Sequence, residues 1–126
     1  MFRKYFAYGA IGASLAVALG AFGAHGLKDM VSEKLLTVYE TGVRYHMYHA
    51  LGIMLIALLA DRIGDSKLLR NGVRLLIVGI ILFSGSLYAM TLTAYSKLGA
   101  ITPLGGVAFI TGWICVTTAV LGKKTK

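Results

Sequence analysis

The sequence predicts an all-α, polytopic membrane protein. We expect a four-transmembrane-helix bundle, with an amphipathic interfacial helix on the outer side between the first two spans. Three observations predict this architecture. Hydrophobic residues make up 57% of the 126-residue chain and charged residues only 14%, whereas soluble domains carry roughly 25% charged residues. Four apolar runs have the length of a membrane span. The basic residues collect on one side of these runs.

Each apolar run contains 19 or 20 residues. At about 1.5 Å of rise per residue, such a run crosses a hydrocarbon core about 30 Å thick. Backbone groups in lipid must bond within their own segment, so the runs predict helices. We expect residues 1–126 to form a single integral membrane domain. The predicted spans are 5–24, 42–60, 75–94 and 104–122.

The basic residues predict the orientation. Nine of them lie before the first span, between the second and third spans, or after the fourth. The other side carries four: Lys28, Lys34, Arg44 and Lys97. Because basic loops stay in the cytoplasm, we expect a multi-pass protein of the bacterial plasma membrane with both termini cytoplasmic. The net charge of +8 then indicates contact with membrane lipids. No nucleic-acid partner is expected, because the chain has no basic face or RNA-binding motif.

The segment between the first two runs is amphipathic. Leu27, Val31, Leu35 and Val38 recur at helical spacing, with charged and polar residues between them. This pattern favours a helix that lies in the outer interface, with Ser32 as a candidate N-cap. Only a glycine interrupts the pattern before the second run, so one bent helix is the alternative.

Small residues recur every four positions in the first run, and a similar stripe follows the fourth. Helices in lipid associate by close packing, which small side chains permit. We interpret both stripes as internal packing seams. A groove for another helix or a lipid chain is the alternative. The predicted packing residues are Gly12, Ala16, Gly20, Ala24, Gly105 and Gly112.

A polar cluster opens the second run. The purely apolar stretch after it, residues 50–60, is only eleven residues long, about half of what a crossing needs. The polar residues are therefore expected at or just below the outer headgroup level, where they face the bundle interior or an aqueous cavity. The candidate cluster is His25, Glu40, Arg44, Tyr45, His46, Tyr48 and His49.

Glu40 and Arg44 stand four residues apart, in the favourable order for an ion pair on a helix. We expect them to form one hydrogen-bonded network with His25 and His49, with all three histidines at the outer end. This predicts a structural role for the cluster. A metal or haem site, and a site that responds to protons or lipid headgroups, are the alternatives.

Signs of catalysis are absent from the sequence. There is no glycine-rich phosphate loop and no HExxH motif, and the five acidic residues lie in or near the predicted loops. Proton-coupled transporters often use carboxylates inside their spans, so coupled transport is disfavoured. We expect no enzymatic activity and no cofactor.

Three strings resemble the signatures of a family of small bacterial membrane proteins of unknown function. They are GAFGAHGL at 20–27, ETGVRYHMYHA at 40–50 and LGAITPLGG at 98–106. The resemblance implies about four spans and a distant vertebrate transmembrane relative, and it supplies no mechanism. His46 departs from the family pattern, which more often has glutamine there, and this weakens a metal role for that residue.

The favoured function is that of a structural or accessory membrane protein. It would pack with the helices of a membrane-protein partner, form a homo-oligomer, or modulate lipid. One alternative is a binding protein for a small ligand, lipid headgroup, quinone or haem at the outer histidine cluster. The other is a small transporter or channel subunit.

Overall fold

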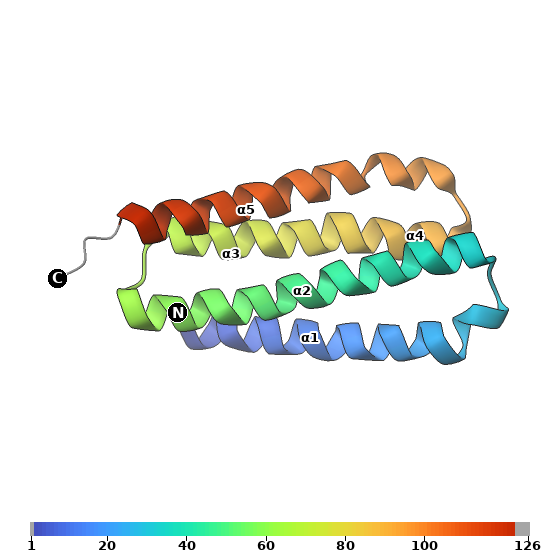
Figure 1. Ribbon diagram of the computed structural model, residues 1–126, viewed down its shortest axis with the longest axis horizontal. Coiled ribbons are helices and arrows are strands. Elements are labelled where there is room, and N and C mark those ends of the chain that lie inside the picture. The colour runs from blue at the N-terminus through green and yellow to red at the C-terminus, as the bar shows by residue number, and fades with distance from the viewer. Residues whose placement is uncertain (1, 123–126) are drawn as a thin grey trace.

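The computed structural model describes residues 2–122, and all its regular elements in this range are helical. Four helical rods lie side by side (Figure 1), and each is long and apolar enough to cross a membrane. The elements are α1 (Phe2–His25), η1 (Leu27–Asp29), α2 (Glu33–Ile63), α3 (Lys67–Gly79), η2 (Ile80–Ser84), α4 (Gly85–Thr93), η3 (Ser96–Ala100) and α5 (Thr102–Gly122).

The third rod is built from three elements. α3 passes into the π-helical turn η2, which passes into α4 without a break in the rod. Such a turn opens the regular bonding pattern of a helix and is frequent near functional sites. The rod stops at Ala94, whose φ of 59° is left-handed and ends the helix as a residue at this position often does.

Helix α2 takes the place of two expected elements, the end of the interfacial helix and the second span. The amphipathic segment is divided between the short 3₁₀ turn η1 and the first turns of α2, so no separate interfacial helix is present in residues 2–122. The predicted cap is confirmed, because Ser32 Oγ accepts a hydrogen bond from Leu35 N at 3.2 Å. Since α-helical geometry continues through Gly42, the alternative of one helix describes this region.

The rods are held together unequally. Helix α1 packs along α2, α3 packs along α5, and α2 contacts α3, η2 and α4. In the most apolar stretch of the first rod only 17% of the residues are buried, whereas 44% are buried in the corresponding stretch of α2. Figure 1 places α1 and α5 at opposite edges of the view, and it places the start of α1 and the end of α5 at the end where α2 turns into α3.

Glycines let the backbones of adjacent rods approach closely. A Cβ on Gly9 would lie 2.7 Å from the carbonyl oxygen of Ala50, and a Cβ on Gly112 would lie 3.1 Å from that of Gly72. A Cβ on Gly105 would overlap the backbone nitrogen of Phe83. Because these neighbours are backbone atoms, they cannot turn aside as a flexible side chain can. The α1–α2 and α3–α5 seams therefore depend on glycine.

The predicted packing residues lie mostly on these seams. Gly12 and Gly20 face α2, at Ala50 and Val43, and Ala16 is buried. Gly105 and Gly112 face the third rod. Ala24, in contrast, is exposed at the end of α1, because the chain turns away into η1 directly after it.

We predict that Gly105→Ala lowers the free energy of unfolding by about 1–3 kcal/mol, the usual effect of overpacking. The matched control is Gly106→Ala on the same turn, because a Cβ there meets no atom within 4 Å. Melting temperatures of both variants in mild detergent provide the measurement. Equal melting temperatures for the two variants would contradict a close-packed seam at Gly105.

Candidate functional site

The polar cluster predicted from sequence is split by the helix that carries it. His46 and His49 point inward and are buried, with 6% and 7% exposure. Arg44 and Tyr48 on the same helix are exposed. His46 and His49 lie near the middle of α2, whereas His25 ends α1. The expectation that all three histidines gather at the outer end is therefore wrong, because α2 begins nine residues before the predicted span.

His46 joins α2 to the third rod. Its Nδ1 lies 2.9 Å from the hydroxyl of Tyr88, whose ring covers Gly42. The ring of Tyr39 lies 5.3 Å from that of Tyr88, and the Tyr39 hydroxyl donates to the carbonyl of Leu19 at 2.6 Å. Buried polar contacts therefore tie α1, α2 and α4 to one another.

His49 joins α2 to α5. Its ring stacks on Phe109, with 3.6 Å between the ring centroids and 10° between the planes. Nδ1 lies 2.7 Å from the carbonyl oxygen of Tyr45. A carbonyl can only accept, so Nδ1 carries the hydrogen and donates it. Tyr45 itself is partly exposed and contacts Phe83 through its ring. Within residues 2–122, no group of three or more His, Cys, Asp or Glu side chains is arranged to hold a metal ion.

Hydroxyl groups on the third rod complete this buried polar layer. Ser84 Oγ donates to the carbonyl of Gly42 at 2.7 Å. Thr91 Oγ1 lies 3.2 Å from the carbonyl of Leu35, and the hydroxyls of Ser86 and Thr102 lie 2.6 Å apart. In the described part of the chain, every buried side-chain nitrogen and oxygen has a hydrogen-bond partner. The layer therefore fastens helices where the hydrophobic effect between them is weak.

These residues of the third rod are absent from the candidate cluster. A signal for them exists in the sequence, since Ser84, Tyr88 and Thr91 recur at positions i, i+4 and i+7 and so share one helix face. A polar stripe inside an apolar span is a marker of a helix–helix interface.

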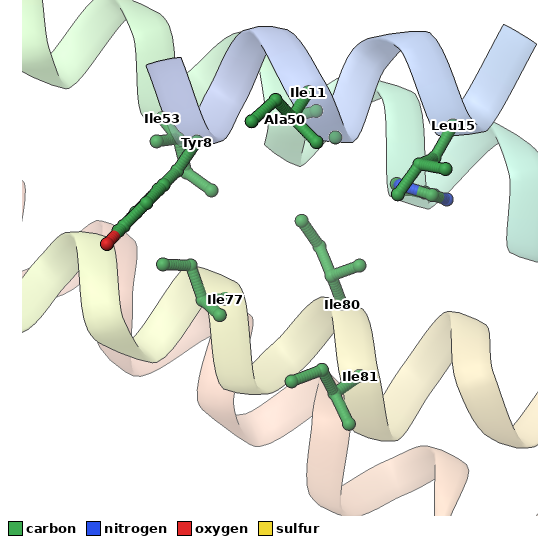
Figure 2. A pocket seen from close by; sticks show the side chains of 10 residues that line it. Tyr8, Ile11, Leu15, Ala50, Ile53, Ile77, Ile80 and Ile81 are labelled. Carbon is green, nitrogen blue, oxygen red and sulfur yellow. The ribbon is translucent and has the colours of Figure 1, made fainter. Parts of the chain in front are cut away.

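A lateral groove opens beside the layer, between α1 and the third rod (Figure 2). It has a volume of about 330 Å³. Ile77 and Ile80 project toward α1 from the third rod, and Tyr8 and Leu15 extend from α1. Ile11 and Ile81 also line the groove. His46 contributes to the lining at the α2 side. Its full lining is Tyr8, Ile11, Gly12, Leu15, His46, Ala50, Ile53, Ile77, Ile80 and Ile81.

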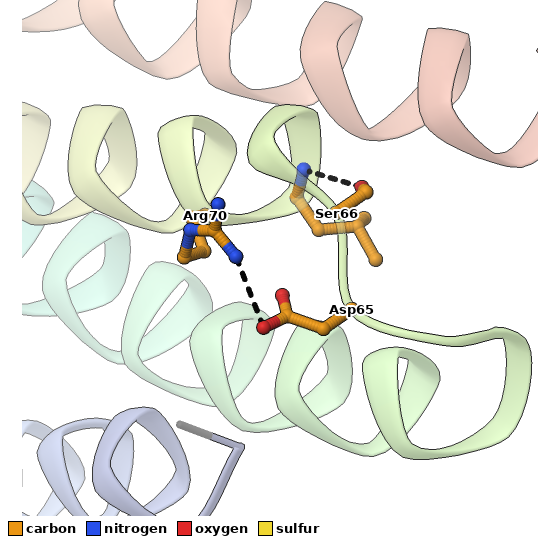
Figure 3. A network of polar contacts seen from close by, with 4 residues as sticks. Asp65, Ser66 and Arg70 are labelled. Carbon is orange, nitrogen blue, oxygen red and sulfur yellow. Dashed lines mark hydrogen bonds and ion pairs between the residues drawn. The ribbon is translucent and has the colours of Figure 1, made fainter.

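The charged members of the predicted cluster do not form the expected network. Arg44 Nη2 bonds to Thr41 Oγ1 at 3.3 Å, and no ion pair joins Arg44 to Glu40. His49 follows Arg44 by five positions, which is a rotation of about 140° around the helix axis. The side chains of Arg44 and His49 therefore face different surroundings. The one ion pair in residues 2–122 joins Asp65 to Arg70 at 3.0 Å, in the turn from α2 to α3 (Figure 3).

We predict that Tyr88→Phe lowers the free energy of unfolding by about 0.5–2 kcal/mol, because the buried His46 loses its interhelical partner. The matched control is Tyr48→Phe. Tyr48 lies on α2, two residues after His46, and is 56% exposed. Its hydroxyl makes no hydrogen bond within residues 2–122. Thermal unfolding in mild detergent tests the pair. A Tyr48→Phe loss as large as that of Tyr88→Phe would refute an organising role for the His46–Tyr88 contact.

Comparison with known proteins gives consistent matches over most of the chain. Residues 19–106 match the family model described as "Protein of unknown function (DUF423)". The UPF0382 membrane protein YwdK of Bacillus subtilis is 53% identical over 117 residues, which cover 93% of this chain and 95% of that protein. A UPF0382 membrane protein of Staphylococcus epidermidis is 46% identical, with 94% and 96% covered.

A more distant relative extends the match to almost the full length. A UPF0382 membrane protein of Haemophilus influenzae is 42% identical over 125 residues, covering 99% of both chains. No solved structure matches the chain. The relatives carry the name of membrane proteins, in agreement with the four candidate spans. The chain belongs to the DUF423 family of membrane proteins of unknown function.

Proposed function

We propose that this protein is a non-enzymatic accessory protein of the bacterial plasma membrane, and that it holds a lipid acyl chain in the lateral groove. The observation that carries the proposal is the groove itself. It has an almost entirely apolar lining, because α1 packs along α2 and leaves its other side open toward the third rod.

The depth of the groove favours hydrocarbon as its content. Gly12 is close to the middle of α1, and Ala50 and Ile53 are close to the middle of α2. All three line the groove. A site at mid-span faces the acyl region of a bilayer, where no headgroup or water competes for it.

The shape of the lining favours a lipid acyl chain over a protein helix as the occupant of the groove. Close docking of a helix requires small residues at the contact. Here the small residues Gly12 and Ala50 lie where α1 already meets α2. The open rim is formed by large side chains, of which Ile11, Leu15 and Ile81 are more than half exposed. A flexible chain can follow such a surface, whereas a second copy of the protein or a partner helix would meet its ridges.

One polar group gives a second candidate. His46 lines the groove, where its Nδ1 is engaged by Tyr88 and its ring also contacts the Gly12 backbone, so a ligand would take the place of the Gly12 contact. A lipid-soluble molecule with a carbonyl head, such as a quinone, would then place its tail in the groove and its head at His46. Identifying the molecules that co-purify with the wild type and with His46→Ala separates a quinone from an acyl chain.

We predict that a phospholipid with a photoreactive group in its acyl chain labels Ile77, Ile81 and Ile11 more strongly than Ile110. Ile110 on α5 is 62% exposed but lies outside the groove, so it reports ordinary lipid contact. Ile80→Trp should fill the groove and reduce labelling there several-fold, while Ile110→Trp leaves it unchanged. The measurement is mass spectrometry of labelled peptides from reconstituted protein.

Labelling that follows exposure alone would refute the acyl-chain site. Co-purification of a quinone that His46→Ala removes would support the second candidate, and crosslinks between two copies through the groove would support an oligomer instead.

We also propose that both termini are cytoplasmic, on the strength of the nine-to-four distribution of basic residues. In a Cys115→Ala background, an impermeant thiol reagent added to intact cells should label Ser96→Cys and leave Lys123→Cys unlabelled. Permeabilised cells provide the control, since both cysteines should then react. Labelling of Lys123→Cys alone in intact cells would reverse the topology.

A further inference from the structure

A second pocket lies between α1 and α2. It has a volume of about 270 Å³ and stands at the end of the bundle where α1 turns into α2. Its floor is formed where Gly20 and Gly23 of α1 approach α2. The lining, called here the headgroup pocket, is Gly20, Gly23, Tyr39, Glu40, Val43 and Arg44. Arg44 and His46 are two residues apart, about 200° around α2, so this pocket and the lateral groove occupy different faces.

Two opposite charges line the headgroup pocket without neutralising each other. Glu40 and Arg44 form no ion pair with each other or with any other group of residues 2–122. Arg44 makes one hydrogen bond, to Thr41, although a guanidinium offers five N–H donors. Charged groups at membrane depth pair with something. The free donors of Arg44 and the free carboxylate of Glu40 therefore define a two-part polar site.

The depth of these charges corresponds to lipid headgroups. Helix α2 has 31 residues and is about 46 Å long, about 16 Å more than a hydrocarbon core. If this excess is shared between both ends, about 8 Å of α2 projects beyond the core at each end. Glu40 is then close to the core boundary, and Arg44 lies one turn deeper, from where its long side chain reaches back to the boundary.

The order of the two charges selects the kind of headgroup. Arg44 is the deeper group and Glu40 the shallower one, at one-turn spacing along α2. In a phospholipid the phosphate is anchored next to the glycerol, and an ethanolamine group extends from it by two carbons toward water. We propose that the headgroup pocket binds a phospholipid with a primary amine, with its phosphate on Arg44 and its ammonium on Glu40.

Charge complementarity separates this lipid class from anionic ones. A phosphate on Arg44 forms charge-assisted hydrogen bonds whatever the rest of the headgroup carries. An anionic headgroup such as phosphatidylglycerol offers the Glu40 carboxylate only neutral hydroxyl donors and no opposite charge, and hydrogen bonds between neutral donors and a carboxylate are weaker than those from an ammonium. Other basic residues at this end of the bundle, such as Lys28 and Lys34, lie outside the lining of the pocket. Glu40 therefore determines which headgroup is preferred.

The test uses the full-length protein in mild detergent. Dioctanoyl phosphatidylethanolamine and dioctanoyl phosphatidylglycerol compete for it, and native mass spectrometry measures the ratio of bound lipids. We expect a preference of roughly tenfold for the ethanolamine lipid, as one charge-assisted hydrogen bond provides. Glu40→Gln, which keeps the shape of the side chain, should bring the ratio close to one. Arg44→Gln should weaken the binding of both lipids.

The matched control is Glu33→Gln, on the same helix but outside the pocket, which should keep the wild-type preference. Melting temperatures without lipid verify that Glu40→Gln and Glu33→Gln are folded, and this pair decides the proposal even if Arg44→Gln fails to fold. Equal binding of both lipids to the wild type, or an equal response to the two glutamate substitutions, would overturn the proposal. Displacement of both lipids by inorganic phosphate alone would also overturn it, in favour of a simple anion site.

The outcome is independent of the lateral groove. Ile80→Trp fills the groove on the other face and should leave the headgroup preference unchanged. Failure of the acyl-chain proposal would therefore be seen in the labelling of Ile77 and Ile81, and failure of the headgroup proposal in the lipid ratio.

Discussion

The structure depends on how closely helix backbones can approach one another in a medium that does not push them together. In lipid, apolar side chains gain little from facing each other instead of the acyl chains. Cohesion must come from dispersion contacts at short range and from hydrogen bonds between helices. Gly9 against Ala50 and Gly112 against Gly72 provide the first. Ser84 to Gly42 and Tyr88 to His46 provide the second.

The two kinds of contact are distributed differently over the rods. Glycine contacts extend along α1–α2 and α3–α5, so the four rods form two close pairs. The hydrogen bonds of Ser84, Tyr88 and Thr91 cross between the pairs, at the face where α2 meets the third rod. Among the hydrogen bonds of residues 2–122, none of this kind joins α1 to the third rod. Helix α1 packs mainly along α2, and Tyr5 is its buried residue in the core cluster shared with Leu69 and Val73 of α3. The lateral groove lies open further along α1, so it follows from the distribution of contacts.

The sequence predicts the parts of this arrangement that depend on length and composition. Four apolar runs of span length become four rods, and Ser32 caps α2 as its position indicates. Gly12 and Gly20 lie against α2 because their spacing keeps them on one face. These features are local or periodic, so a single chain contains the information for them.

The pairing of side chains between rods could not be derived in the same way. The partner of His46 is Tyr88, 42 residues away, and no spacing rule connects two helices of unknown rotation. The extent of α2 also matters. Because the helix begins at Glu33 and not at Gly42, the polar segment moves from the end of a span to the middle of a longer helix. That shift buries two histidines that were expected at the headgroup level, and it leaves Glu40 nearer the end of the helix, with Arg44 one turn further in.

The position of Glu40 and Arg44 follows from the same length of α2. A helix of about 46 Å exceeds the hydrocarbon core, so its first turns lie among headgroups when the excess is shared between its two ends. Charged residues there are tolerated because Arg44 can extend toward the boundary. Beside those charges, Gly20 and Gly23 let Val43 and Tyr39 of α2 approach α1, and all four residues line the pocket. Glycines that serve the α1–α2 seam therefore also line a polar pocket at the depth where lipid phosphates and amines are found.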